Sequence, residues 1–185
     1  MLSKRSIALA AFVCVALATA GIAVATVKSG GVAAASATFA TTSVSNNVTK
    51  TCSIASGDTY SFTRAQYTGT STSADARLNG PMVVNAEIVL DVTTGVGALV
   101  GHFNIDGVGD ARAHGKIEAA LAAGQVSGMV RAHVGSPYGE LFAGINGGFT
   151  GAAGFSAASL GAGASTDSGV VLYHGACVKH IPLGW

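Results

Sequence analysis

Basic residues are scarce in this sequence, which argues against nucleic acid as a partner. Only ten Lys and Arg occur in 185 residues, and three of them lie in the first 28 positions. The remaining seven Lys and Arg are outnumbered by nine Asp and Glu, and they form no cluster that could neutralise phosphates. The few aromatic residues are not interleaved with arginines, as single-strand binders require. We therefore expect no nucleic-acid partner.

Cysteine is rarer still, and its spacing excludes a dithiol redox centre. The chain has three cysteines and no Cys-x-x-Cys pair. Cys14 lies in an apolar N-terminal run, whereas Cys52 and Cys177 lie near the two ends of the remaining sequence. In an oxidising compartment we predict a disulfide between Cys52 and Cys177. Closing a loop of about 124 residues would stabilise the fold by roughly 4–5 kcal/mol.

Motifs for catalysis and for metal binding are also missing. None of the five histidines has another two positions away, and none belongs to a Cys/His cluster, so we expect no metal site. Glu87 and Asp91 would lie about 13 Å apart on an extended strand, too far for a glycosidase pair. The run at 154–158 departs from a nucleophile elbow in its last residue. The sequence therefore predicts no catalytic residue and no cofactor.

The N-terminal segment does carry a recognisable signal. An uncharged run from Ile7 to Val27 follows two basic residues, which is typical of a secretion signal or a membrane anchor. Its many Ala and Gly residues, and the small-x-small pattern at 35–37, favour cleavage near Ala37. We assign residues 1–37 as signal peptide or membrane anchor and expect a secreted or extracytoplasmic protein. A single-pass membrane protein is the alternative, and contact with a membrane is expected only if the segment is retained.

The rest of the chain is dominated by period-two alternation. Residues 38–50, rich in Ser, Thr, Ala and Asn without a period, predict a flexible linker. From residue 51 onward, alternating segments separated by turn residues predict strands. They lie at 58–70, 83–92, 96–105, 114–124, 125–134, 139–149, 154–164 and 169–178.

Eight sequential antiparallel strands leave two exposed edges unless the sheet closes on itself. Residues 51–185 are therefore predicted to form an all-β, eight-stranded antiparallel up-and-down barrel. A barrel of this size is either filled by side chains or holds one small ligand. The spacing Gly95-x-Gly97-x-x-x-Gly101 suggests a phosphate loop, but no helix follows it. We interpret Thr93–Gly95 as a hairpin turn, and the two later glycines as points where a strand bends or a neighbouring backbone comes close.

Alternation also predicts which side chains face the barrel interior. The small residues Ala86, Gly97, Gly101 and Ala119 share the interior face, so an apolar cavity is expected there. The predicted interior set is Val84, Ala86, Ile88, Leu90, Leu99, Phe103, Ile117 and Leu121. The predicted solvent-facing set is Glu87, Asp91, His102, Lys116 and Glu118.

Three residues are candidate ligand contacts. Phe103 is expected on the wall of the barrel interior. Arg131 and His133 share one face of the strand at 125–134, and if that face turned inward they could anchor a carboxylate on an apolar ligand. The valines and Ala132 on the opposite face favour the outward orientation for both.

Two stretches resemble a known family. YTGTSTSADARLNGPMVV, at 67–84, contains a Tyr-x-Gly strand end and a Ser-x-Asp-x-Arg-Leu-x-Gly turn. DVTTGVGALVGHF, at 91–103, contains a Thr-Gly-x-Gly hairpin. Over residues 67–149 the chain resembles bacterial secreted proteins with the allene-oxide-cyclase-like and dirigent-like barrel. The resemblance implies the barrel architecture. Such barrels include plant cyclases that steer a reactive substrate in an apolar cavity without a cofactor, and dirigent proteins that orient radical coupling.

Together these features predict an exported, non-catalytic barrel that binds a small apolar ligand or serves in the cell envelope. A homo-oligomer is compatible with either role. A cofactor-independent cyclase-like or isomerase-like enzyme is the alternative. An apolar cavity would favour ligand binding, whereas a filled interior with an exposed apolar patch would favour a structural role.

Overall fold

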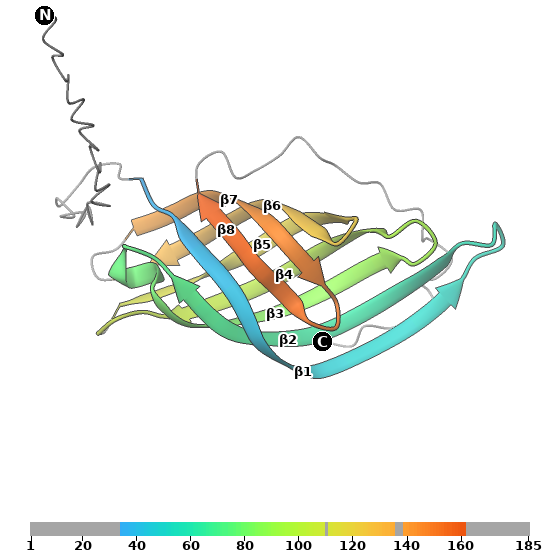
Figure 1. Cartoon of the computed structure of the whole chain (residues 1–185), viewed down its shortest axis with the longest axis horizontal. Coiled ribbons are helices and arrows are strands. Elements are labelled where there is room, and N and C mark those ends of the chain that lie inside the picture. Colours follow the sequence, from blue (N-terminus) through green and yellow to red (C-terminus); the bar gives the residue numbers. More distant parts are fainter. Residues whose placement is uncertain (1–33, 110, 136–138, 162–185) are drawn as a thin grey trace, which may run out of the picture.

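The predicted barrel is present. A computed structural model of the chain describes residues 34–109, 111–135 and 139–161. Its eight strands form a closed antiparallel barrel in which each strand pairs with the next along the chain and β8 pairs with β1 (Figure 1). The strands are β1 (Ala37–Ser53), β2 (Thr59–Thr72), β3 (Gly80–Asp91), β4 (Val96–Asp106), β5 (Arg112–Ala122), β6 (Gln125–Val134), β7 (Gly139–Thr150) and β8 (Gly154–Gly161).

Strand β1 occupies the segment for which the sequence predicts a flexible linker, so that prediction is wrong for residues 38–50. The strand pairs with β2 from Thr38 to Ser53, and the ladder supplies partners for its backbone groups. Its register shifts twice, between Thr41 and Ser43 and between Ser45 and Val48. Each shift breaks the period of two, and this explains why the residues show no alternation in the sequence.

Closure of the barrel depends on this same strand. Within the described residues, β1 pairs with β8 only from Ala37 to Phe39, opposite Leu160 to Ala158. The first seven predicted strands, from 58–70 to 154–164, correspond to β2–β8. The eighth predicted strand, at 169–178, lies outside the described residues. The predicted cleavage position near Ala37 coincides with the first residue of β1. Most of the proposed signal segment also lies outside the described residues.

The barrel interior is packed with the side chains that alternation predicts. Val84, Leu99, Phe103 and Ile117 are fully buried, and the rest of the predicted set is buried except Leu90, which is half-buried. An apolar cavity was expected beside the small interior residues, but at Gly97 the neighbouring backbone occupies that space. A Cβ atom at Gly97 would lie 2.4 Å from the Val89 carbonyl oxygen, so the glycine brings neighbouring backbones together.

On the outer face, two residues of the predicted solvent-facing set are less exposed than predicted: Glu87 is half-buried beside Arg64, and Asp91 is buried. Asp91 is only 8% exposed, because the β3–β4 turn folds back over it. Its carboxylate accepts hydrogen bonds from the Thr93 backbone N–H and the Thr94 hydroxyl, both at 2.8 Å. Gly95 ends this turn with φ of 72° and donates its N–H to the Asp91 carbonyl, as the predicted hairpin requires. Asp91 is therefore a turn-capping residue.

An aromatic cluster joins the first two strands to the last two. The Tyr67 ring lies 5.6 Å from that of Phe149 and 5.8 Å from that of Phe155, both edge to face. Phe39 packs against Phe155 with ring centroids 5.3 Å apart. The Tyr67 hydroxyl donates a hydrogen bond of 3.0 Å to the Gly151 carbonyl in the β7–β8 turn. Among the described residues β1 and β8 share three backbone pairs, and these rings add side-chain contact across the closure.

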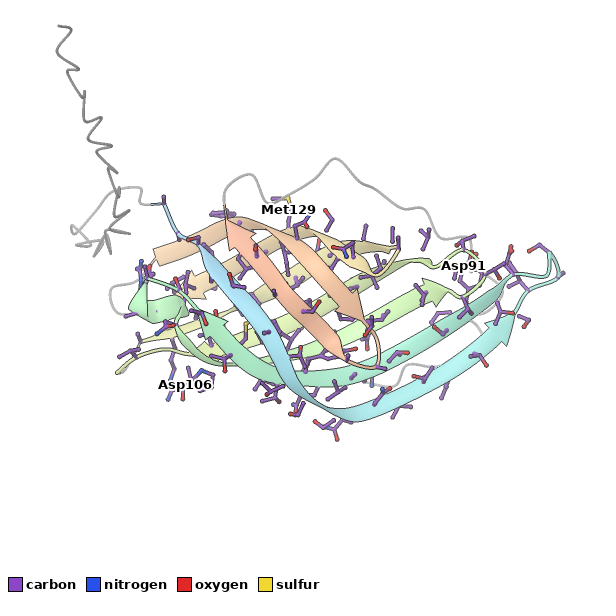
Figure 2. The ribbon with its side chains drawn as sticks, in the orientation of Figure 1. Asp91, Asp106 and Met129 are labelled. Atoms are coloured by element: carbon purple, nitrogen blue, oxygen red, sulfur yellow. The ribbon has the colours of Figure 1, made fainter. Side chains whose placement is uncertain are left out.

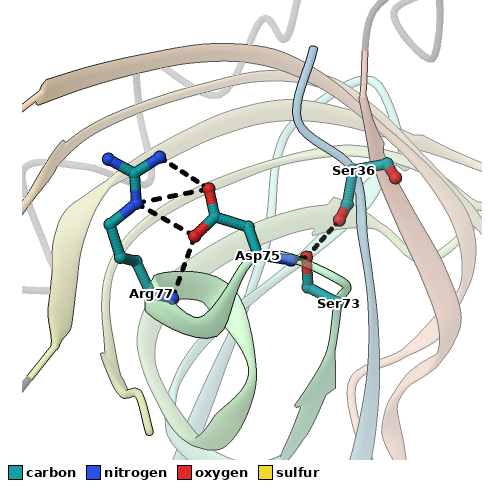
Figure 3. Close-up of polar contacts among 4 residues, drawn as sticks. All are labelled: Ser36, Ser73, Asp75 and Arg77. Atoms are coloured by element: carbon teal, nitrogen blue, oxygen red, sulfur yellow. Dashed lines mark hydrogen bonds and ion pairs between the residues drawn. The ribbon is translucent and has the colours of Figure 1, made fainter. Parts of the chain in front are cut away.

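One end of the barrel is plugged by a short 3-10 helix, η1 (Ala76–Leu78). Leu78 is 2% exposed, and its carbonyl accepts a hydrogen bond of 2.6 Å from the buried Ser71 hydroxyl. Figure 3 shows Asp75 capping η1 through the Arg77 backbone N–H, at 3.0 Å, while the Arg77 guanidinium pairs with the same carboxylate. The Ser73 hydroxyl reaches the Ser36 carbonyl beside the start of β1. The motif at 73–80 is therefore a structural plug.

We expect these capped carboxylates to make the fold acid-labile. The hydrogen bond from Arg77 lowers the pKa of Asp75, and that from the Thr94 hydroxyl lowers the pKa of Asp91. A carboxyl whose pKa is lower in the folded state contributes stability above its unfolded pKa, near 4, and loses it as the pH falls further. Urea unfolding from pH 7 to pH 2 should show the unfolding free energy dropping below about pH 4. A double variant, Asp75→Asn with Asp91→Asn, should show a shallower drop; an unchanged slope would contradict this assignment.

Candidate functional site

A hollow of about 410 Å³ opens at the end of the barrel opposite η1. Figure 2 labels Asp91 at this end and Asp106 at the plugged end. Three hairpin turns, β3–β4, β5–β6 and β7–β8, surround the opening. The volume falls in the range of small-molecule sites, roughly 300–1,000 Å³. We call this feature the mouth hollow.

The floor of the mouth hollow is apolar. Ile88 and Leu121 are each 4% exposed and Phe149 is 5% exposed, while the half-buried Leu90 completes the surface. These residues come from β3, β5 and β7, whose inward faces meet only because the sheet is closed. The rim is polar but uncharged, and its side chains are Asn47, Thr49, Ser61, Thr63, Gln125 and Thr150.

The described lining of the mouth hollow consists of apolar, hydroxyl and amide side chains. Among the described residues that line the hollow, none is acidic, basic, a thiol or a phenol. The phenol of Tyr67 lies beside the rim, where its hydroxyl donates a hydrogen bond to the Gly151 carbonyl. Burial raises the pKa of Tyr67 to about 12, so the phenol stays protonated at neutral pH and cannot act as a base.

The three predicted ligand contacts line one hollow of about 440 Å³, but it lies on the outer face of the sheet and not inside the barrel. The side chain of Phe103 is fully buried in the barrel interior. Arg131 and His133 lie on the outer face of the sheet, as the opposing valines favoured. The Arg131 guanidinium lies 3.7 Å from the Glu140 carboxylate and 5.2 Å from the Phe142 ring centroid. Because odd-numbered positions of β6 face outward, neither residue can reach a ligand inside the barrel.

The sequence analysis did not predict that the residues of the mouth hollow lie together. Ile88, Leu90 and Leu121 were predicted to face inward, but alternation does not show that they meet at one end. Phe149 and the rim carried no signal at all. Tyr67 stood out only as part of the Tyr-x-Gly motif, whereas in the structure its ring and hydroxyl support the rim.

The predicted disulfide stays a prediction, because Cys177 lies outside the described residues. Cys52 is half-buried near the end of β1. It packs, with Ile54 and Val89, against the buried rings of Tyr60 and Phe62.

The fold and the hollow together define a class: a closed eight-stranded up-and-down barrel, plugged at one end and with an apolar, uncharged opening at the other. Comparisons of the chain with protein-family models, with curated proteins and with solved structures gave no match. Within the described ranges, no helix has the length and hydropathy needed to cross a bilayer.

Proposed function

We propose that this protein binds a compact apolar molecule in the mouth hollow. The observation that carries the proposal is the composition of the lining, an aliphatic and aromatic floor inside a rim of hydroxyl and amide side chains. Such a floor stabilises an apolar ligand by removing its surface from water, at about 25 cal/mol per Å². The rim can orient one polar group of the ligand through a neutral hydrogen bond.

Export is part of the same proposal. It is supported by the apolar N-terminal run with its basic flank, and by the two cysteines near the ends of the domain, which we propose are bonded. The turn motifs at 73–80 and 94–97 support a relationship to the allene-oxide-cyclase-like barrels at the level of architecture. A role in the cell envelope would be compatible with binding at the mouth.

A cyclase-like enzyme would use the same hollow, since such barrels steer a reactive substrate against an apolar wall. The described lining offers no acid or base to such a reaction, and this favours binding.

The binding proposal is tested with a neutral naphthylamine fluorophore, which brightens on leaving water. Ala152 lines the hollow and is exposed, so Ala152→Trp should fill the opening without disturbing the core. Ala153 is the matched control, since it is also exposed but is not part of the lining. We expect Ala152→Trp to weaken binding by about tenfold or more, equivalent to about 1.4 kcal/mol. Ala153→Trp should bind as the unaltered protein does.

Two outcomes would overturn the proposal. One is that the folded protein leaves the fluorescence of the probe unchanged. The other is that both tryptophan variants weaken binding equally, which would place the probe elsewhere on the molecule.

A further inference from the structure

The outer face of the barrel carries a row of potential metal ligands that the sequence order conceals. In the register of β4 to β7, Asn104 lies opposite His114, His114 opposite His133, and His133 opposite Glu140. All four side chains are exposed. The row crosses four neighbouring strands, so its members are up to 36 positions apart in the chain yet adjacent in space.

The two histidines at the centre of the row are already close together. Their ring centroids lie 5.5 Å apart, with the ring planes at 41° to each other. A zinc ion binds an imidazole nitrogen at about 2.0–2.1 Å, so two rings on one tetrahedral ion have centroids about 5 Å apart. Small changes in the side-chain torsions of His114 and His133 would therefore suffice. Both side chains are exposed, so such changes leave the barrel core undisturbed.

We propose that His114 and His133 form a site for a divalent transition-metal ion on the outer face of the barrel. Imidazole is a preferred ligand of Zn²⁺, Ni²⁺ and Cu²⁺, and the neutral form of each ring supplies the lone pair. Among the described residues, no three or more His, Cys, Asp and Glu side chains already converge as a metal cluster. The site is thus an open one with two imidazole ligands, completed by water or by the flanking Asn104 and Glu140. It is independent of the mouth hollow.

The surrounding charges set the affinity. Lys116 and Arg131 lie opposite each other in the next row, beside the two histidines, and both repel a cation. Arg131 is partly compensated by the Glu140 carboxylate, 3.7 Å away. Across from Lys116, on β4, lies His102, a third imidazole with no histidine opposite it. Removal of the Lys116 charge should therefore strengthen metal binding, whereas loss of the Glu140 charge should weaken it.

The test is calorimetric titration of the full chain with ZnCl₂ and with CuCl₂ at pH 7.5. We expect His114→Ala and His133→Ala each to weaken binding by about tenfold or more, because each variant removes one of the two ligands and even the loss of a group that supports a ligand typically costs this much. His102→Ala is the matched control and should leave the affinity unchanged. Lys116→Gln should strengthen binding a few-fold, and this gain should shrink at high salt. Cu²⁺ bound to the protein should show two imidazole nitrogens by electron paramagnetic resonance.

Three results would overturn the assignment. The unaltered protein could show no binding at millimolar metal. Binding could survive unchanged in the His114→Ala and His133→Ala variants, which would place the ion on histidines outside the row. His102→Ala could weaken binding as strongly as the other two, which would rule out a two-histidine site. Thermal unfolding of each variant without metal should match that of the unaltered protein, since all three side chains are exposed.

Discussion

Replacing Phe103 by Ala should lower the free energy of unfolding by about 3–5 kcal/mol. The Phe103 ring is fully buried, and the residue lies between Val84 on β3 and Gly115 on β5. Gly115 has no side chain that could move into the space left by the ring. The backbones there already lie close together, since an added Cβ at Gly115 would lie 2.2 Å from the Arg131 carbonyl oxygen. The cavity would therefore persist, and cavities of this kind account for the upper part of the range.

Urea unfolding of the Phe103→Ala variant provides the measurement, and a residue on the same strand provides its control. Val100 is 52% exposed on the outer face of β4, so Val100→Ala should change the stability by no more than about 0.5 kcal/mol. A small effect of Phe103→Ala, comparable to that of Val100→Ala, would contradict the packed interior. It would instead favour the original interpretation of Phe103 as the wall of a cavity.

Replacing Tyr67 by Ala should cost a similar amount, about 3–5 kcal/mol, for a different reason. Tyr67 contacts Phe149 and Phe155 and so connects β2 with β7 and β8, across the part of the barrel where closure is weakest. Loss of the ring removes packing on both sides of the β1–β8 seam. We therefore also expect faster proteolysis near β1, because local opening of the seam becomes easier.

The Tyr67→Phe variant separates the ring from the hydroxyl. It keeps the edge-to-face contacts but loses the hydrogen bond to the Gly151 carbonyl, so the expected cost is about 1 kcal/mol. Since Gly151 lines the mouth hollow, this variant should also bind the fluorescent probe less tightly. A cost as large as that of Tyr67→Ala would mean that the hydrogen bond, and not the aromatic cluster, maintains the closure.

The sequence by itself determined the positions of strands β2 to β8 and the inward faces of β3, β4 and β5. Alternation is a local property: each side chain points to the face opposite that of its neighbour, so positions such as Val84 and Ile88 could be assigned without knowledge of the fold. Short turns between the strands then left the antiparallel meander as the simplest topology.

Tertiary structure alone decided the features that depend on register and closure. Strand β1 was read as a linker because its two bulges interrupt the alternation, and only its pairing with β2 and β8 reveals it as a strand. The mouth hollow forms where the ends of β3, β5 and β7 meet, and the pairing of His114 with His133 follows from the register of β5 and β6. Neighbours across strands have no fixed separation in sequence, so no spacing along the chain could have predicted either one.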